Sequence, residues 1–179
     1  IGDLPRARTQ LERVLARAPD DPRALAGMGM ILRAKREFDG AIAAGRKATQ
    51  LRPTRAAFHL ELGLTLIAAG QGDAGDREIE AALALNPEHV AALRARAMRR
   101  AEDHDLAEAE RLLRRALEVQ PAAAKSWFFL AQVLLDAGRL EDAIEACRRG
   151  LERDPANEPG LVNLGGLLWQ NGQREAALT

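Results

Sequence analysis

Cysteine and histidine are the side chains that most often act as nucleophiles, bases or metal ligands. The sequence has one cysteine, Cys147, and a cysteine nucleophile needs a base within reach. The residues beside it are Glu145, Ala146, Arg148 and Arg149. We therefore expect Cys147 to be a small buried hydrophobic residue rather than a nucleophile, because buried thiols are commonly inert.

The three histidines, His59, His89 and His104, are scattered and have no second His or Cys at metal-ligand spacing. We expect His59 to be a packed core histidine, and we predict no metal site and no cofactor. The glycines do not cluster as in a phosphate-binding loop, and no pair of carboxylates stands out. These absences predict a protein that is not an enzyme.

Basic and acidic residues both number 26, so the formal net charge is zero. A nucleic-acid-binding protein usually has a basic excess, so we expect no nucleic-acid partner. No apolar run approaches the length of a membrane span, so we expect no membrane insertion. A single cysteine excludes an internal disulfide and favours a reducing compartment, so the cytoplasm is expected, with the periplasm left open.

Five prolines recur at a spacing of 34 residues and reveal a repeat. They are Pro19, Pro53, Pro87, Pro121 and Pro155. We number the positions of a unit so that these prolines occupy position 32. Positions 8 and 20 are then always Gly or Ala, which lets two antiparallel helices approach closely. Position 15 is Gly in four units (Gly2, Gly70, Gly138 and Gly172), and glycine suits the end of a helix.

Apolar residues spaced three and four apart, with Ala, Leu, Arg and Glu abundant, predict an all-α chain. We expect Asp21 to cap one first helix, and Asp3, Asp73 and Asp105 to cap second helices. The predicted helices span 4–17, 22–35, 38–51, 55–69, 73–85, 89–102, 106–119, 123–136, 140–153 and 157–170.

One unit carries the pattern most fully, through Trp127, Leu130, Ala131, Leu134, Gly138, Ala143, Ala146 and Pro155. This unit, and with it the whole chain, resembles the tetratricopeptide repeat family. The resemblance implies a right-handed superhelical solenoid of antiparallel helix pairs, with no enzymatic activity. It also implies that the first helix of each pair lines a concave groove, where such proteins usually hold a partner's peptide or helix.

The repeat predicts a single solenoid over 1–179. Its units would be 1–21 (partial), 22–55, 56–89, 90–123, 124–157 and 158–179 (partial). Because the sequence opens and closes inside second helices, we expect it to be a fragment of a longer chain.

If the family geometry holds, positions 2, 5, 9, 12 and 13 of each first helix face the groove. The last such helix places Pro159, Val162, Gly166, Trp169 and Gln170 there. We expect the partner-binding residues to be Met30, Leu60, Leu64, Ile67, Arg94, Met98, Phe128, Gln132, Leu135 and Trp169. Contiguous exposed apolar side chains favour a partner with an apolar anchor. The alternative is that the stripe of Leu60, Leu64 and Ile67 packs against a neighbouring repeat.

Arg96 and Arg100 occupy positions 7 and 11, where the repeat otherwise has apolar residues. One interpretation is a phosphate or carboxylate site that also uses Arg94 and Arg99. The other, which we favour because charge runs are usually solvated faces, is ion pairing with nearby carboxylates. The candidate carboxylates are Glu78, Glu80, Asp103 and Asp105.

The predicted function is a protein–protein interaction scaffold that holds a partner peptide or helix in an apolar groove. The chaperone-tail clamp of some family members requires Lys, Asn and Arg, but the matching positions are Ala26, Met30, Glu61, Ala91 and Ala95. A chaperone tail is therefore not expected. Two alternatives stay open: a non-catalytic arm of a larger enzyme such as a transferase, and a self-assembly module joining copies through uncapped ends.

Overall fold

The computed structural model describes residues 4–173, and all regular structure in this range is helical. The first helices of the repeats are α2 (Pro22–Ala34), α4 (Ala56–Ala68), α6 (Val90–Glu102), α8 (Ala124–Asp136) and α10 (Glu158–Gln170). The second helices are α1 (Leu4–Arg17), α3 (Phe38–Leu51), α5 (Gly72–Leu85), α7 (Leu106–Val119) and α9 (Leu140–Arg153). Every boundary lies within one residue of the predicted range. The all-α helical-repeat solenoid is therefore confirmed.

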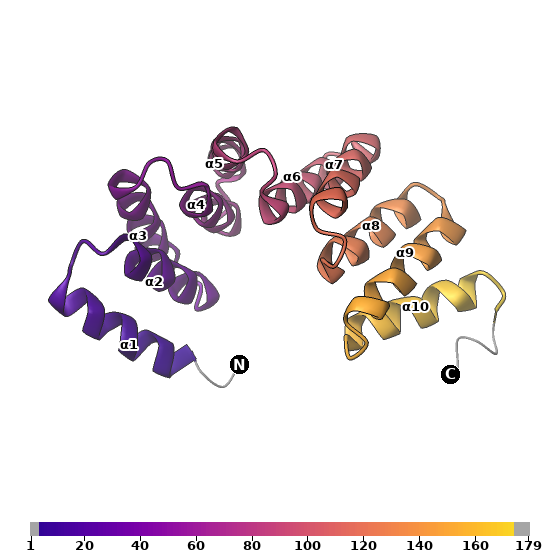
Figure 1. The fold of residues 1–179 in the computed structure, drawn as a ribbon, viewed down its shortest axis with the longest axis horizontal. Coiled ribbons are helices and arrows are strands. Elements are labelled where there is room, and N and C mark those ends of the chain that lie inside the picture. Colours follow the sequence, from indigo (N-terminus) through magenta and orange to yellow (C-terminus); the bar gives the residue numbers. More distant parts are fainter. Residues whose placement is uncertain (1–3, 174–179) are drawn as a thin grey trace. The chain divides into compact units, whose positions relative to one another are not determined.

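The chain divides into two compact units, Ile1–Ala92 and Leu93–Thr179. In the first unit α2 packs on α3, α3 on α4, and α4 on α5. In the second unit α7 packs on α8, α8 on α9, and α9 on α10, as the ribbon shows (Figure 1). Within each unit these helices thus pack on their neighbours in sequence, and α2 also packs on the next first helix, α4.

The first helices end in a left-handed turn. Gly70, Gly138 and Gly172 have φ values of 81°, 75° and 77°. In each turn the glycine and the residue after it donate backbone hydrogen bonds to carbonyls of the last helical turn. The role predicted for glycine at position 15 is confirmed at these three places, whereas Gly2 lies outside the described residues.

Proline separates one repeat from the next because it cannot continue a helix. The residue before each of three prolines leaves the helical conformation: Arg52, Asn86 and Gln120 have φ values of −141°, −144° and −138°. The second helix therefore stops, and the chain turns into the following first helix.

Side-chain caps appear at some helix starts. The Asp21 carboxylate accepts a 2.7 Å hydrogen bond from the Ala24 amide, and Asp105 accepts one of 3.2 Å from the Glu108 amide. Both predicted caps are confirmed. The prediction for Asp73 is wrong, because α5 already begins at Gly72 and its preceding residue, Gln71, makes no side-chain cap. Asp3 lies outside the described residues.

Small residues allow the two helices of a pair to approach closely. A methyl group at Gly63 would lie 2.8 Å from the Gly75 carbonyl oxygen, and one at Gly75 would lie 2.7 Å from the Gly63 carbonyl oxygen. The backbones of α4 and α5 are thus in direct contact, with no room for a side chain. Three of the alanines at positions 8 and 20, Ala41, Ala97 and Ala143, are fully buried, whereas Ala7 at position 20 of α1 is exposed.

Candidate partner-binding site

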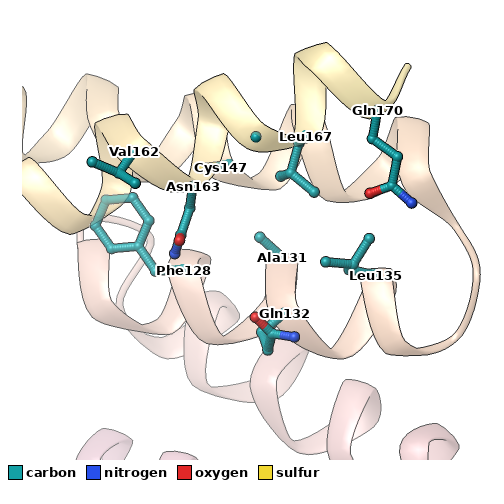
Figure 2. Close-up of a pocket in the computed structure, with 10 residues that line it drawn as sticks. Phe128, Ala131, Gln132, Leu135, Cys147, Val162, Asn163, Leu167 and Gln170 are labelled. Carbon is teal, nitrogen blue, oxygen red and sulfur yellow. The ribbon is translucent and has the colours of Figure 1, made fainter. Parts of the chain in front are cut away.

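A pocket of about 410 Å³ opens between the first helices α8 and α10. Figure 2 shows the side chains of the two helices facing each other across it. Its lining residues are Phe128, Ala131, Gln132, Leu135, Cys147, Val162, Asn163, Gly166, Leu167 and Gln170. The walls are therefore mostly apolar, and the side-chain amides of Gln132, Asn163 and Gln170 supply polar groups.

The Phe128 ring forms one end of the pocket and is held by two glycines. A methyl group at Gly150 of α9 would lie 2.5 Å from the Phe128 ring, and one at Gly160 of α10 would lie 2.7 Å from it. The ring therefore fills the space that side chains at these glycines would occupy. Phe128 is half-buried for this reason, so only part of the ring is available to a partner.

Three side-chain amides supply the polar groups of the pocket. The Gln132 amide nitrogen donates a 2.8 Å hydrogen bond to Asp136 one turn along α8, which orients the Gln132 side chain. Asn163 and Gln170 are exposed on α10. An amide both donates and accepts hydrogen bonds, so these three side chains match the N–H and C=O groups of a peptide main chain.

Cys147 lies behind the pocket on α9 and is buried, as predicted. Its Sγ is 3.5 Å from the Gly160 carbonyl oxygen, to which it donates. Burial raises the pKa of the Cys147 thiol, because a thiolate would lose its hydration there. The buried position thus disfavours the thiolate that a cysteine nucleophile requires.

The structure brings Phe128, Gln132 and Leu135 together in this pocket. Trp169, also expected in the groove, is 55% exposed on α10 but does not line the pocket. Asn163 and Leu167 line the pocket without having been expected in the groove. Both lie one residue beyond an expected position. Helical spacing could have found them, because Asn163 lies three residues before Gly166 and Leu167 lies three residues before Gln170.

The groove residues predicted on α2 and α4 are not equally accessible. Met30 is 46% exposed, as expected for a groove residue. Leu60 is 3% exposed, contrary to the expectation that solvent reaches it. Leu64 and Ile67 are half-buried, and Ile67 lies so close to Gly75 of α5 that a methyl group there would be 2.5 Å from its side chain. Packing against the neighbouring helix thus accounts for much of this stripe.

On α6, Met98 is 39% exposed and Arg94 is half-buried. Burial lowers the pKa of the Arg94 guanidinium, since the charged form loses hydration. Arg100 lies 3.6 Å from Asp103, one of the carboxylates expected to pair with it. A hydrogen bond from Arg111 lowers the pKa of Glu108, and the charges of Arg100 and Arg96 contribute. One pair of the ion-pair interpretation, Arg100 with Asp103, is therefore present.

His59 is half-buried and hydrogen-bonded rather than packed only among apolar groups. Its Nδ1 lies 2.7 Å from Glu78 Oε2, and its Nε2 lies 2.8 Å from the Pro53 carbonyl oxygen. Trp127 stands at the same repeat position, and its indole N–H donates a 2.9 Å bond to the matching carbonyl of Pro121. The role of His59 is therefore to tie the turn to the helix pair.

Residues 4–173 contain no group of three or more His, Cys, Asp or Glu side chains arranged to hold a metal ion. Within the same range, no helix is both long and apolar enough to cross a membrane.

Comparison with known proteins gives the same fold. The chain is similar to the crystal structure of MamA, with 23% identity, 84% of this chain and 88% of MamA covered, and a TM-score of 0.69. It is also similar to TTC0263, a thermophilic tetratricopeptide repeat protein of Thermus thermophilus. The identity is 22%, coverage is 94% of this chain and 92% of TTC0263, and the TM-score is 0.84.

A third similar structure is the human IFIT1 dimer solved with PPP-AAAA. Here the identity is 22% and the TM-score is 0.80. The match includes 97% of this chain and 43% of the IFIT1 chain. No curated protein sequence matches the chain. The family model of the tetratricopeptide repeat matches residues 1–56 and 94–158, which is more than half of the chain. Together with the 34-residue helix pairs and their glycine-closed turns, this match shows that the chain belongs to the tetratricopeptide repeat family.

Proposed function

We propose that this protein is a non-catalytic scaffold that holds a segment of another protein against α8 and α10. The observation that carries the proposal is the pocket of about 410 Å³ between these two helices. Ligand pockets commonly measure about 300–1,000 Å³, and they combine apolar walls with a few polar groups. A large apolar side chain of the partner would enter the pocket, and the neighbouring amides would bind its main chain.

The charge balance supports a protein partner over a nucleic acid. Basic and acidic residues are equal in number, so the chain as a whole has no excess positive charge to attract a phosphate backbone. The apolar pocket walls favour the same choice, because an aliphatic or aromatic side chain gains most from leaving water there.

The test uses two neighbouring residues of α10. Val162 lines the pocket and is 74% exposed, whereas Leu161 is 51% exposed and does not line it. Peptides would be selected from a random displayed library on the wild-type protein, and their affinities measured by calorimetry. We expect the selected peptides to share an apolar anchor. We also expect Val162→Glu to weaken peptide binding at least about tenfold, because a carboxylate at the pocket would be desolvated.

Leu161→Glu is the matched control and should bind the same peptides as the wild-type protein does. Equal affinity of both variants, with helical circular dichroism retained, would remove the α8–α10 pocket as the binding site. Selection of peptides without an apolar residue would contradict the proposed chemistry of the partner.

A further inference from the structure

Two notches of similar volume occur one repeat apart in the first compact unit. The first has a volume of about 430 Å³, and its lining residues are Asp21, Pro22, Arg23, Arg52, Arg55 and Phe58. The second has a volume of about 360 Å³, and its lining residues are Thr54, Arg55, Ala56, Ala57, Leu85, Asn86 and His89. Each notch lies where a first helix begins beside the turn that leads to the next first helix.

A shift of 34 residues relates the two linings. Arg23 of the first notch corresponds to Ala57 of the second, and Arg52 corresponds to Asn86. The repeat therefore produces the shape at both places, but only the first notch combines three arginines. The fold does not require arginine at these positions, since the second notch forms with Ala57 and Asn86 at two of them.

The three arginines have little to neutralise them. Among the described residues, no carboxylate forms an ion pair with Arg23, Arg52 or Arg55. The only acid in the lining is Asp21, and its carboxylate already accepts the hydrogen bond that caps α2. Its neighbour Asp20 lies 2.5 Å from the Lys47 ammonium group, so it is paired elsewhere. The notch is thus a local site of positive charge on a chain with no net charge.

We propose that this notch is a binding site for a phosphate monoester. Guanidinium groups donate paired hydrogen bonds to phosphate oxygens, and a monoester presents three such oxygens on one compact group. Its charge of about −1.5 to −2 near neutral pH suits three guanidinium groups better than a single carboxylate does. This site is separate from the pocket between α8 and α10, so its existence does not depend on the function proposed above.

The arrangement also distinguishes a monoester from a nucleic-acid backbone. Binding to a phosphodiester strand requires positive charge spread along a groove or face, so that successive phosphates are contacted. Here the three arginines line one notch, and the equivalent notch of the next repeat has Ala57, Asn86 and His89 in their place. One isolated phosphate group matches this distribution.

The experiment follows the arginine Nε–H signals by NMR while inorganic phosphate is added at constant ionic strength. We expect saturable shifts for Arg23, Arg52 and Arg55. The variants Arg23→Gln and Arg52→Gln should each weaken phosphate binding about two- to fivefold, which is the range for exposed charge pairs. Arg46→Gln, which removes an exposed charge of α3 outside the notch, should leave the affinity unchanged.

Parallel titrations with acetate and with a short single-stranded oligonucleotide test the class of ligand. Acetate should bind more weakly than phosphate, and the oligonucleotide should not shift the three signals together. Equal weakening by Arg46→Gln, or equal binding of acetate or of the oligonucleotide, would overturn the proposal.

The second notch provides a test by gain of function. The triple variant Ala57→Arg, Asn86→Arg, His89→Arg places arginine at the positions equivalent to Arg23, Arg52 and Arg55. If three arginines around such a notch suffice, the folded triple variant should bind a second equivalent of phosphate. A folded variant that binds no more phosphate than the wild-type protein would contradict the explanation offered for the first notch.

Discussion

The turn that closes the first helix contains different residues in different repeats. Position 15 is glycine at Gly70, Gly138 and Gly172, but it is Arg36 and His104 in the other two described repeats. Arg36 and His104 are the two non-glycine residues with positive φ among the described residues, at 63° and 62°. The residue at position 15 thus has a positive φ whether or not it is glycine, because the repeat imposes this backbone conformation.

Exchanging residues between two of these turns should therefore change stability in opposite directions. A left-handed conformation costs a non-glycine residue roughly 1–2 kcal/mol, although glycine loses more entropy on folding. We expect His104→Gly to raise the free energy of unfolding by up to about 1 kcal/mol, and Gly138→His to lower it by about 1 kcal/mol. Both residues lie in the second unit, so urea unfolding followed by tryptophan fluorescence measures them on the same scale.

No atom lies within 4 Å of the position of a Cβ at Gly138, so a clash cannot explain a loss of stability there. If Gly138→His proved as stable as the wild-type protein, backbone strain would not be the reason for glycine at this position.

At the scale of elements, two glycines inside helices differ in the space around them. Gly150 of α9 leaves room for the Phe128 ring, whereas a methyl group placed at Gly166 of α10 would meet nothing within 4 Å. Alanine favours a helix over glycine by about 1 kcal/mol, so propensity alone predicts that both Gly→Ala changes stabilise the protein.

Packing should reverse that expectation at one of the two sites. Gly150→Ala should lower the free energy of unfolding by about 1–3 kcal/mol, since the new methyl group would lie 2.5 Å from the Phe128 ring. Gly166→Ala should raise it by up to about 1 kcal/mol. Chemical denaturation of the two variants tests both values. Equal effects would mean that α9 and α10 do not hold Phe128 as described.

An ion-pair network joins α7 to α9. The Glu110 carboxylate lies 2.8 Å from Arg114 of its own helix and 2.9 Å from Arg139, which directly precedes α9. Partial burial by itself raises the pKa of the Glu110 carboxyl. Hydrogen bonds from Arg114 and Arg139, together with their charges, outweigh burial, so the pKa lies below its ordinary value.

Because the pKa of Glu110 is lower in the folded state, its stabilising contribution is complete above the unfolded pKa of about 4.3. This contribution is lost as the pH falls through the folded value. We expect Glu110→Gln to remove up to about 1 kcal/mol at pH 7 and to have a smaller effect in more acidic solution. Denaturant titrations between pH 7 and pH 3 measure the difference. Glu118→Gln, at an exposed position of α7, is the control and should show no such dependence.

At the scale of the molecule, the 34-residue period made most of the fold predictable. Proline ends each second helix, small residues at positions 8 and 20 bring the helices of a pair together, and glycine closes several first helices. All these signals are local and agree with one another, so each helix boundary could be placed to within one residue. The misplaced cap at Asp73 shows the limit, since one residue decides whether a side chain precedes a helix or lies in it.

The candidate sites were less predictable, because each depends on several elements at once. Periodicity places Phe128, Gln132 and Leu135 on one face of a helix, but it does not reveal that the Phe128 ring occupies the space left by Gly150 and Gly160. It likewise treats Leu60 as a groove residue, although the structure buries it. The exposed fraction of a side chain depends on the helices that pack around it, so a pattern along one helix cannot determine it.

The sequence by itself determined the repeat, the helices, the helix pairing and the family, because these follow from contacts between residues close in the chain. Only the tertiary structure decided which side chains surround the pocket between α8 and α10, and that three arginines converge on one notch. The physical reason is that both sites are formed by side chains from separate elements, whose approach depends on how the intervening helices pack. Sequence spacing therefore predicts the helices, whereas their packing determines which side chains surround each site.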